Sequence, residues 1–153
     1  MSEISQIKKF LWDACASALM ERKESISQTL EDIVQSLMSE TKSSAGDKHE
    51  TGRAMLQLER EKTGRQLAEI EREQQLLSKI SSETLNSLVR PGSLVITSQA
   101  NYYISISAGK LEKDGIIYYA VSPLAPIAQV LTGNKVGGEI VFQGKTIQIL
   151  EVY

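Results

Sequence analysis

The chain has 153 residues, of which 41% are hydrophobic and 24% are charged, and its 17 basic and 19 acidic residues give a formal net charge of −2. This composition is typical of a folded protein with one domain or two small ones, and it excludes the global basic field of a protein that binds nucleic acid on its own. No stretch approaches the ~20 apolar residues of a membrane span, and the first residues lack the pattern of a secretory signal. We therefore expect a cytoplasmic protein, not associated with a membrane, whose first partner is another protein.

A helical pattern opens the chain. No Pro or Gly occurs from about Ile4 to Met38, and apolar residues recur there in alternating steps of three and four. This spacing predicts a coiled-coil seam that faces one partner helix. The predicted seam positions are Ile4, Ile7, Leu11, Ala14, Ala18, Ile26, Leu30, Ile33 and Leu37. The one cysteine, Cys15, lies in this apolar stretch, and we interpret it as a buried structural residue because no His is near it in the sequence.

A second helical pattern follows a short polar turn. Its seam repeats every seven residues, at Leu56, Thr63, Ile70, Leu77 and Thr84. The pattern ends at Arg90-Pro91-Gly92, since Pro91 disfavours a helical conformation in the residue before it. Two amphipathic helices of matching length with a short connection predict an antiparallel coiled-coil hairpin of residues 1–89, with its tip at 43–51. The alternative is that the helices pair between two chains, and the composition of the turn favours the hairpin.

Residues 90–153 have a different composition, with short runs rich in β-branched residues and Tyr between turn signals. The predicted turns include Gly109-Lys110, Lys113-Asp114-Gly115 and Gln143-Gly144. The predicted strands are Ser93–Thr97, Tyr102–Ser107, Ile116–Val121, Glu139–Phe142 and Thr146–Val152. One short helix is predicted at Pro126–Leu131, because Pro suits a first helical turn and Thr132-Gly133 ends it. The chain as a whole is therefore predicted to be α+β, with a small antiparallel sheet and one short helix in its second part. The aromatic residues Tyr102, Tyr103, Tyr118, Tyr119 and Phe142 are expected to pack in the core, one of each neighbouring pair pointing inward.

Two motifs resemble a known family. Ser122-Pro123-Leu124-Ala125, the following segment 126–138 and the closing strand that ends Ile149-Leu150-Glu151-Val152 are similar to the C-terminal FKBP-like domain of the bacterial Gre transcript-cleavage factors (GreA/GreB type). Gly46-Asp47-Lys48-His49-Glu50 resembles the Gly-Asp-x-x-Glu at the tip of that family's coiled coil. The next residues depart from the family, because Thr51-Gly52-Arg53-Ala54 stand where it has Asn-Ala-Glu-Tyr. The resemblance implies that residues 90–153 form an FKBP-like domain.

The resemblance also implies a function. Gre-like proteins bind RNA polymerase and insert the coiled coil into its secondary channel, where the tip acids help hold the second catalytic magnesium and stimulate cleavage of backtracked RNA. Carried over by position, Asp47 and Glu50 would be the catalytic residues and the magnesium ligands, with the ion held jointly with the polymerase. The enzyme would be the polymerase and not this protein, which would meet nascent RNA and DNA only through the elongation complex and would act as a monomer. The contacts with the polymerase would include Pro126, Ile127, Gly133 and Lys135.

The tip residues also have other interpretations. Judged by spacing alone, Asp47 and Glu50 form the capping-box-like arrangement of many helix starts. The absent third acid and aromatic residue suit a Gre-like regulator that occupies the channel without stimulating cleavage. A peptidyl-prolyl isomerase or chaperone with a coiled-coil arm and a structural coiled-coil adaptor are alternatives from other classes. The isomerase needs an aromatic-lined pocket, whereas the only Trp, Trp12, lies in the first helix.

Further polar residues near the turn have two interpretations each. His49 can act as an acid or base near neutral pH, although an exposed His at a turn is more often merely polar. Arg53, Arg60 and Arg65, with Lys62 nearby, can contact RNA or the acidic rim of a channel. The ordinary alternative is an intrahelical ion pair such as Glu61–Arg65.

Overall fold

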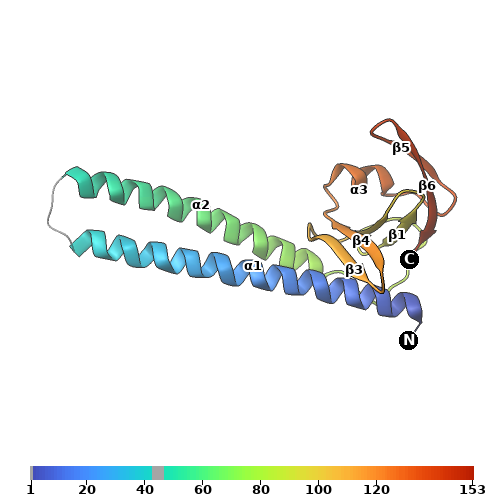
Figure 1. The fold of residues 1–153 in the computed structure, drawn as a ribbon, viewed down its shortest axis with the longest axis horizontal. Helices are drawn as coiled ribbons and strands as arrows, with labels where there is room; N and C mark the ends of the chain where they lie inside the picture. Colours follow the sequence, from blue (N-terminus) through green and yellow to red (C-terminus); the bar gives the residue numbers. More distant parts are fainter. Residues whose placement is uncertain (1, 43–46) are drawn as a thin grey trace. The chain divides into compact units, whose positions relative to one another are not determined.

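The protein consists of two long helices followed by a sheet and a short helix (Figure 1). The computed structural model describes residues 2–42 and 47–153, and for residues 40–42 and 47–49 it describes the backbone alone. The helices are α1 (Glu3–Lys42), α2 (Asp47–Ser78) and α3 (Pro126–Leu131). The strands are β1 (Leu94–Thr97), β2 (Asn101–Ile104), β3 (Gly109–Lys113), β4 (Ile116–Val121), β5 (Glu139–Phe142) and β6 (Lys145–Val152). The α+β class predicted from the sequence is confirmed.

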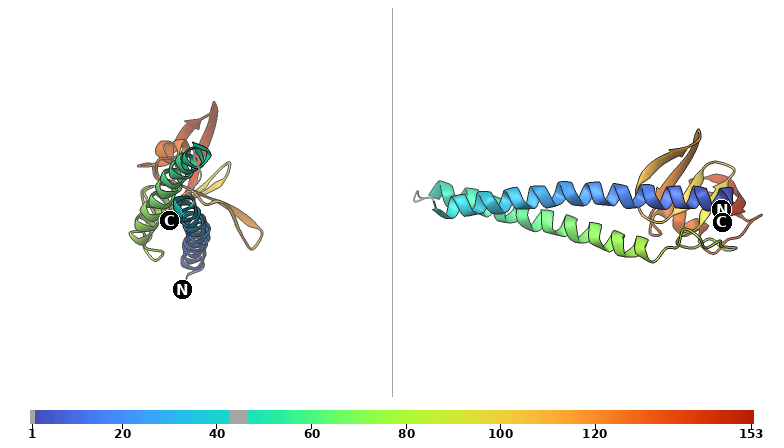
Figure 2. Two further views of the ribbon diagram at one scale, coloured as in Figure 1. Left: turned by 90° about the vertical axis from the view of Figure 1, so that its left-hand side faces the viewer. Right: turned by 90° about the horizontal axis from the view of Figure 1, so that it is seen from below.

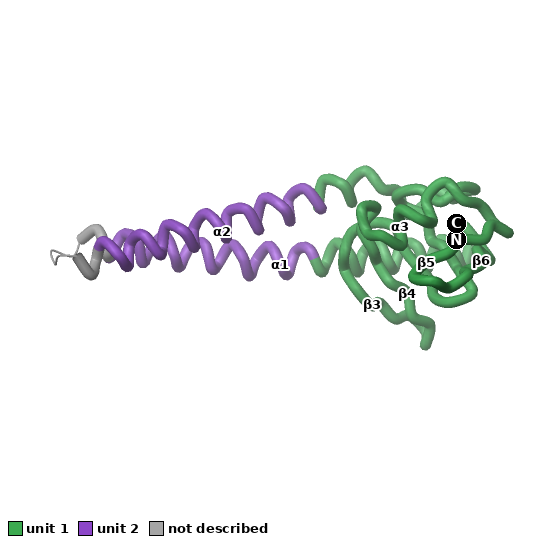
Figure 3. The backbone as a smooth tube through the Cα atoms, turned by 90° about the horizontal axis from the view of Figure 1, so that it is seen from above, with its two compact units in different colours: residues 1–18, 74–153 green, residues 19–73 purple. Residues whose placement is uncertain are grey.

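The chain forms two compact units, which Figure 3 shows in different colours. One unit contains residues 19–73 and is entirely helical, while the other contains residues 1–18 and 74–153 and holds the sheet together with the ends of the two long helices. Each unit is defined by the contacts among its residues, and the unit with the sheet combines two segments that are separated in the sequence. The division into a hairpin of residues 1–89 and a domain of residues 90–153 therefore stays a prediction.

In the unit of residues 19–73, α1 and α2 run antiparallel (Figure 2). The predicted seam residues Ile33 and Leu37 of α1 and Ile70 of α2 are buried. An ion pair crosses between the helices, with Arg22 Nη2 at 2.8 Å from Glu73 Oε2. The predicted pairing of the two helices within one chain is confirmed.

The interior of α2 contains a glycine at a place where a side chain would fit. Apart from its chain neighbours and the nearby backbone of α2 itself, no atom lies within 4 Å of the position that a Cβ on Gly64 would occupy. Since Gly costs about 1 kcal/mol relative to Ala in a helix interior, Gly64→Ala is expected to raise the free energy of unfolding by up to that amount. The measurement is the midpoint of thermal unfolding, followed by circular dichroism. Gly138→Ala is the control and should lower the midpoint, because its Cβ would lie 2.9 Å from the backbone oxygen of Lys135. A lower midpoint for Gly64→Ala would contradict this account of the helix.

The first part of α1 buries a different stripe from the predicted one. Its most buried residues are Lys8, Leu11, Cys15 and Leu19. The prediction is correct at Leu11, but at Ile4, Ile7, Ala14 and Ala18, which are only partly buried, it is wrong by one position. The reason is that residues 1–18 pack in the unit that contains the sheet, so their burial is not set by the partner helix alone. Cys15 Sγ lies 3.6 Å from Ser105 Oγ, beside the end of β2. The predicted burial of Cys15 is confirmed, and burial raises the pKa of its thiol.

α2 ends at Ser78, so the prediction of a helical pattern up to residue 89 is wrong. The two helices have 40 and 32 residues and do not match in length. The indole Nε1 of Trp12 donates to the backbone oxygens of Leu77, at 3.1 Å, and Ile80, at 3.0 Å. Leu77 O also accepts from the backbone nitrogen of Ile80 at 3.0 Å, so Trp12 adds a side-chain donor where the helix ends. Beyond them, Ser81 Oγ accepts from the backbone nitrogen of Glu83 at 3.1 Å, a local bond of the kind that competes with helix.

The six strands lie in the order β3-β4-β2-β1-β6-β5. Neighbouring strands are antiparallel except β2 and β4, which are parallel, with Tyr102 opposite Tyr119. The sheet is therefore mixed, and the prediction of an antiparallel sheet is wrong in this respect. The parallel pair arises because β3 forms a hairpin with β4 at the edge of the sheet, so that β4 enters beside β2 in the same direction.

The strand β3 was not predicted, because Gly109-Lys110 was interpreted as a turn. Gly109 has a φ of +73°, which glycine tolerates, and it is the first residue of β3. The turn predicted at Lys113-Asp114-Gly115 is present, with φ of +52° at Asp114 and +79° at Gly115. Two central residues with positive φ are the geometry of a tight two-residue hairpin, so this turn joins β3 to β4.

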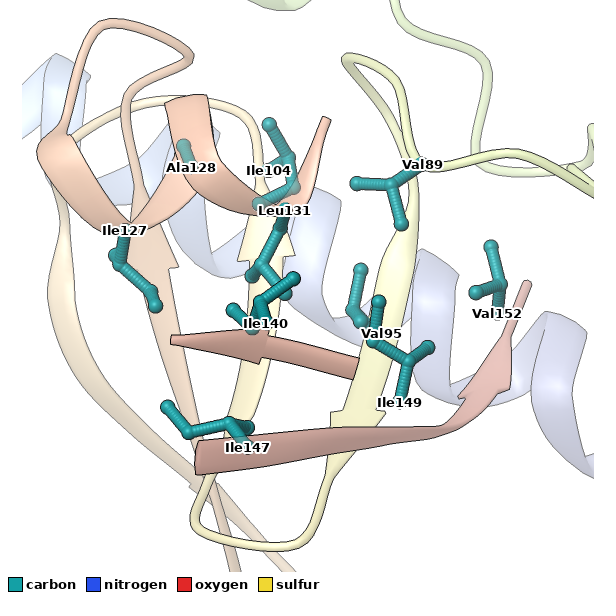
Figure 4. Packing of buried hydrophobic residues seen from close by; sticks show 10 residues of the cluster. All are labelled: Val89, Val95, Ile104, Ile127, Ala128, Leu131, Ile140, Ile147, Ile149 and Val152. Carbon is teal, nitrogen blue, oxygen red and sulfur yellow. The ribbon is translucent and has the colours of Figure 1, made fainter. Parts of the chain in front are cut away.

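A cluster of aliphatic side chains forms the core between the sheet and α3 (Figure 4). Its members are Val89, Val95, Ile104, Ile127, Ala128, Leu131, Ile140, Ile147, Ile149 and Val152. The bounds of α3 and β5 are those predicted from the sequence. The core fixes α3 on the sheet and so positions the turns at both ends of this helix.

Candidate functional site

The two acids singled out at the tip lie in the first turn of α2. The helix begins at Asp47, and Glu50, three residues later, is exposed. Residues three apart on a helix share a face, so the backbone places both acids on one side of the helix start. Residues 43–46 of the predicted tip lie outside the described residues. Asp47 and His49 are described by their backbone alone.

Carboxylates at the start of a helix have two uses. They interact favourably with the positive end of the helix dipole, and they offer hard oxygen ligands to a cation such as Mg²⁺. The two uses are compatible, because a carboxylate that stabilises the helix start still has lone pairs directed outward. The helix includes Asp47 as its first residue, so the two acids suit the interaction with the helix dipole and the ligand interpretation better than the predicted capping box.

The donor set fits a shared magnesium site and not a complete one. Among the residues that the structure describes, no group of three or more His, Cys, Asp or Glu is placed to hold a metal ion. Magnesium takes six ligands in near-octahedral geometry, so two acids one helical turn apart provide a minority of them. Water and a partner would have to supply the others, as a jointly held ion requires.

The basic residues of α2 differ in their surroundings. Arg53 is partly buried, and its Nη1 donates to the backbone oxygen of Leu37 at 3.3 Å, so it bridges the two helices. Arg60, Lys62 and Arg65 are exposed. The predicted Glu61–Arg65 pair is not among the ion pairs of the described side chains.

The four residues expected to contact a partner are not equivalent. Pro126 is the exposed first residue of α3, whereas Ile127 is buried in the aliphatic core with 8% of its surface exposed. Gly133 and Lys135 are exposed in the loop after α3, where Gly133 N donates to Val89 O at 2.9 Å. Pro126 and this loop thus lie at opposite ends of α3, and Ile127 supports the helix from inside.

A turn before α3 holds an exposed apolar side chain that sequence reasoning did not single out. Leu124 is 79% exposed. Its backbone nitrogen donates to Ser122 Oγ at 3.1 Å, and its backbone oxygen accepts from Gln129 Nε2 at 2.8 Å. Pro123 and Pro126 restrict the backbone on both sides, so Leu124 projects from a rigid turn. The sequence signal was a Leu between two prolines in a turn, but its exposure needed the structure.

The aromatic residues of the sheet pack as predicted. Tyr103 and Tyr118 are buried, whereas Tyr102 and Tyr119 are more exposed and their ring centroids lie 6.3 Å apart. The indole nitrogen of Trp12 donates hydrogen bonds to backbone oxygens at the end of α2. These aromatic side chains serve packing, which gives no support to an aromatic-lined pocket of the isomerase class.

Comparison with known proteins gives a distant structural similarity. No protein-family model matches the chain, and no curated protein matches its sequence. Among solved structures, the crystal structure of GreA factor homolog 1 (Gfh1) of Thermus thermophilus is similar at 17% sequence identity and a TM-score of 0.36, covering 88% of this chain and 92% of that one. No helix in residues 2–42 and 47–153 has the length and apolar character to cross a membrane.

Proposed function

We propose that this protein is a Gre-like transcription elongation factor that binds RNA polymerase, inserts its helical hairpin into the secondary channel and stimulates cleavage of backtracked RNA. The observation that carries the proposal is the pair of acids, Asp47 and Glu50, in the first turn of α2, the second of two long antiparallel helices. The resemblance of Gly46-Asp47-x-x-Glu50 and of Ser122-Pro123-Leu124-Ala125 to the Gre family supports it. The protein acts in the cytoplasm as a monomer.

In this proposal the polymerase is the enzyme, and the protein supplies ligands. Asp47 and Glu50 lie three positions apart in the first turn of α2 and therefore on one face of the helix. A magnesium ion held there jointly with the polymerase supplies charge stabilisation and activation of the attacking water. The hairpin positions the two acids, and Arg53 helps to hold α2 against α1 through its bond to Leu37.

A specific observation favours a second candidate function. Thr51-Gly52-Arg53 replaces the third acid of the family motif, and Arg53 is engaged with the backbone of α1. A tip with two acids holds a shared ion more weakly than a tip with three. The second candidate is therefore a channel-occupying regulator that binds the polymerase without stimulating cleavage.

The test that separates the two candidates is RNA cleavage in stalled, backtracked elongation complexes with magnesium. Acceleration of cleavage by the added protein supports the factor, whereas binding with unchanged or slower cleavage supports the regulator. Absence of any binding to the polymerase, measured with the purified core enzyme, overturns both.

The sheet domain is proposed to dock on the polymerase through the turn that presents Leu124. Leu124→Ser is expected to weaken binding to core polymerase roughly tenfold, because an apolar side chain that becomes fully buried in an interface is worth about 1–2 kcal/mol. Leu150→Ser is the matched control, since Leu150 is an exposed leucine on β6, 46% exposed. Equal binding by the Leu124→Ser variant and the unmodified protein would exclude this turn from the interface.

A further inference from the structure

Two large apolar side chains are exposed next to each other on the helical hairpin. Met55 and Leu58 of α2 are 64% and 66% exposed. Because they are three positions apart, they lie on one face of the helix. The seam of α2 is elsewhere, at the buried residues Thr63 and Ile70. Single exposed apolar residues are ordinary on a protein surface, but an adjacent pair outside the seam needs a further reason.

Two cations continue the same face. Lys62 and Arg65 follow Leu58 in steps of four and three, which keeps them on the stripe that begins at Met55. Both are exposed, and neither takes part in an ion pair of the described side chains. An apolar pair followed by two cations without acidic partners is complementary to a surface that has an apolar recess and negative charge at its border.

The stripe leads to a hollow between the two helices. Glu69, four residues beyond Arg65, lines this hollow of about 330 Å³ together with Ile26 and Ile70. One side of the hairpin thus has projecting apolar side chains near the start of α2 and a recess farther along the helix. A partner protein with a complementary surface could contact both the projecting side chains and the recess.

The charge of α2 favours a protein over a nucleic acid as this partner. The helix contains seven acidic and six basic residues, so it has no net basic field to attract phosphates. Phosphates would also leave the aliphatic parts of Met55 and Leu58 without contact. Methionine is flexible and polarisable, and it is common at surfaces that adapt to hydrophobic protein grooves.

We propose that Met55, Leu58, Lys62 and Arg65 form a docking surface for a protein groove that is lined by apolar side chains and bordered by carboxylates. The inference rests on the proposed function, so the groove belongs to the part of RNA polymerase that the hairpin enters. It gives the hairpin a binding role of its own, separate from the tip acids and from the turn at Leu124.

The test compares the affinity of core RNA polymerase for three full-length variants and the unmodified protein. The double variant Met55→Ser/Leu58→Ser is expected to bind at least about tenfold more weakly, as loss of interface anchors usually costs. Lys62→Gln/Arg65→Gln should bind more weakly at low salt, with a difference that shrinks as salt screens the charges. Met38→Ser is the matched control, an exposed methionine of α1 with 55% exposure, and should bind normally. All five substituted positions are exposed, and circular dichroism checks that the helices are intact.

The possible outcomes separate this inference from the proposed function. If the double variant binds like the unmodified protein while Leu124→Ser weakens binding, the polymerase is the partner and the stripe is not a docking surface. A photo-reactive residue in Leu58→p-benzoylphenylalanine should cross-link to a polymerase subunit. Cross-linking to RNA or DNA alone would overturn the inference, and failure of the unmodified protein to bind polymerase would overturn both proposals.

Discussion

Replacing Asp47 by Asn or Glu50 by Gln is expected to reduce stimulated RNA cleavage at least about tenfold while leaving polymerase binding unchanged. Each amide keeps the size of the side chain and one carbonyl oxygen but removes the negative charge that a hard cation prefers. Loss of even a residue that only supports a metal ligand commonly costs roughly ten- to a hundredfold in affinity or activity, so loss of charge on a ligand is expected to cost at least that much. The measurement is the rate of RNA shortening in backtracked complexes over a series of magnesium concentrations, and higher magnesium should restore part of the lost rate.

The control for the tip acids is Glu59→Gln, an exposed acid farther along α2. It should stimulate cleavage like the unmodified protein, because its carboxylate lies more than two helical turns from Glu50. If Asp47→Asn and Glu50→Gln also stimulate normally but lower the thermal midpoint, the acids serve the start of α2 and not a metal ion. Such a result would mean that the protein stimulates cleavage without Asp47 and Glu50 as magnesium ligands.

Local patterns were sufficient to predict the elements that depend on neighbouring residues. The three- and four-residue spacing predicted the two helices and the buried seam at Ile33, Leu37 and Ile70. The bounds of α3 and β5 were also predicted, since Pro126 and Gly133 mark the ends of the helix and β-branched residues mark the strand. In each case the signal lies within a few residues of the element.

The features that were predicted wrongly depend on residues far away in the sequence. The end of α2 is set by Trp12, which lies 65 positions before Leu77 and donates to its carbonyl. The stripe of α1 shifts to Lys8 and Cys15 because these residues pack in the unit that contains the sheet. The parallel pairing of β2 and β4 follows from β3, whose first residue, Gly109, resembles a turn.

Some residues of the candidate site were likewise predicted from local motifs, whereas others became evident only from the structure. A local motif identified Asp47 and Glu50, and the turn at Ser122–Ala125 was identified by resemblance. The exposure of Leu124, and of Met55 and Leu58 on α2, became evident only from the structure, because an apolar residue in a sequence does not show which side of an element it occupies. Burial of Ile127, one of the four expected partner contacts, escaped prediction for the same reason.

The difference in stability between Lys8→Met and the unmodified protein is expected to shrink as the pH rises from 7 to 10. Lys8 is fully buried, and its Nζ donates to the backbone oxygen of Thr84 at 2.6 Å. No carboxylate of the described residues forms an ion pair with it. Burial disfavours the charged form and lowers the pKa of Lys8 from 10.5 to about 8. At neutral pH the folded protein therefore holds a buried ammonium group, a cost that methionine avoids.

The direction of the pH effect follows from proton binding. Between pH 8 and 10.5 folded Lys8 has released its proton while the unfolded chain retains one, so the free energy of unfolding rises with pH. The full shift corresponds to a contribution on the order of 3 kcal/mol. Burial raises the pKa of Cys15 and Tyr103, which lowers stability as the pH rises through the ordinary values of those groups. Both contributions are common to the two proteins and cancel in the difference.

Urea unfolding at pH 7, 8, 9 and 10 measures this difference, with Lys9→Met as the matched control. Lys9 is the neighbouring residue, its side chain is 56% exposed, and it pairs with Asp13 at 3.4 Å. Its replacement should change stability by a small amount that hardly varies over this range, since exposed ion pairs contribute little. A constant gap between Lys8→Met and the unmodified protein would mean that Lys8 keeps its proton in the fold up to pH 10. The bond to Thr84 would then stabilise the ammonium group enough to offset its burial, and the segment after α2 would be held by a charged lysine.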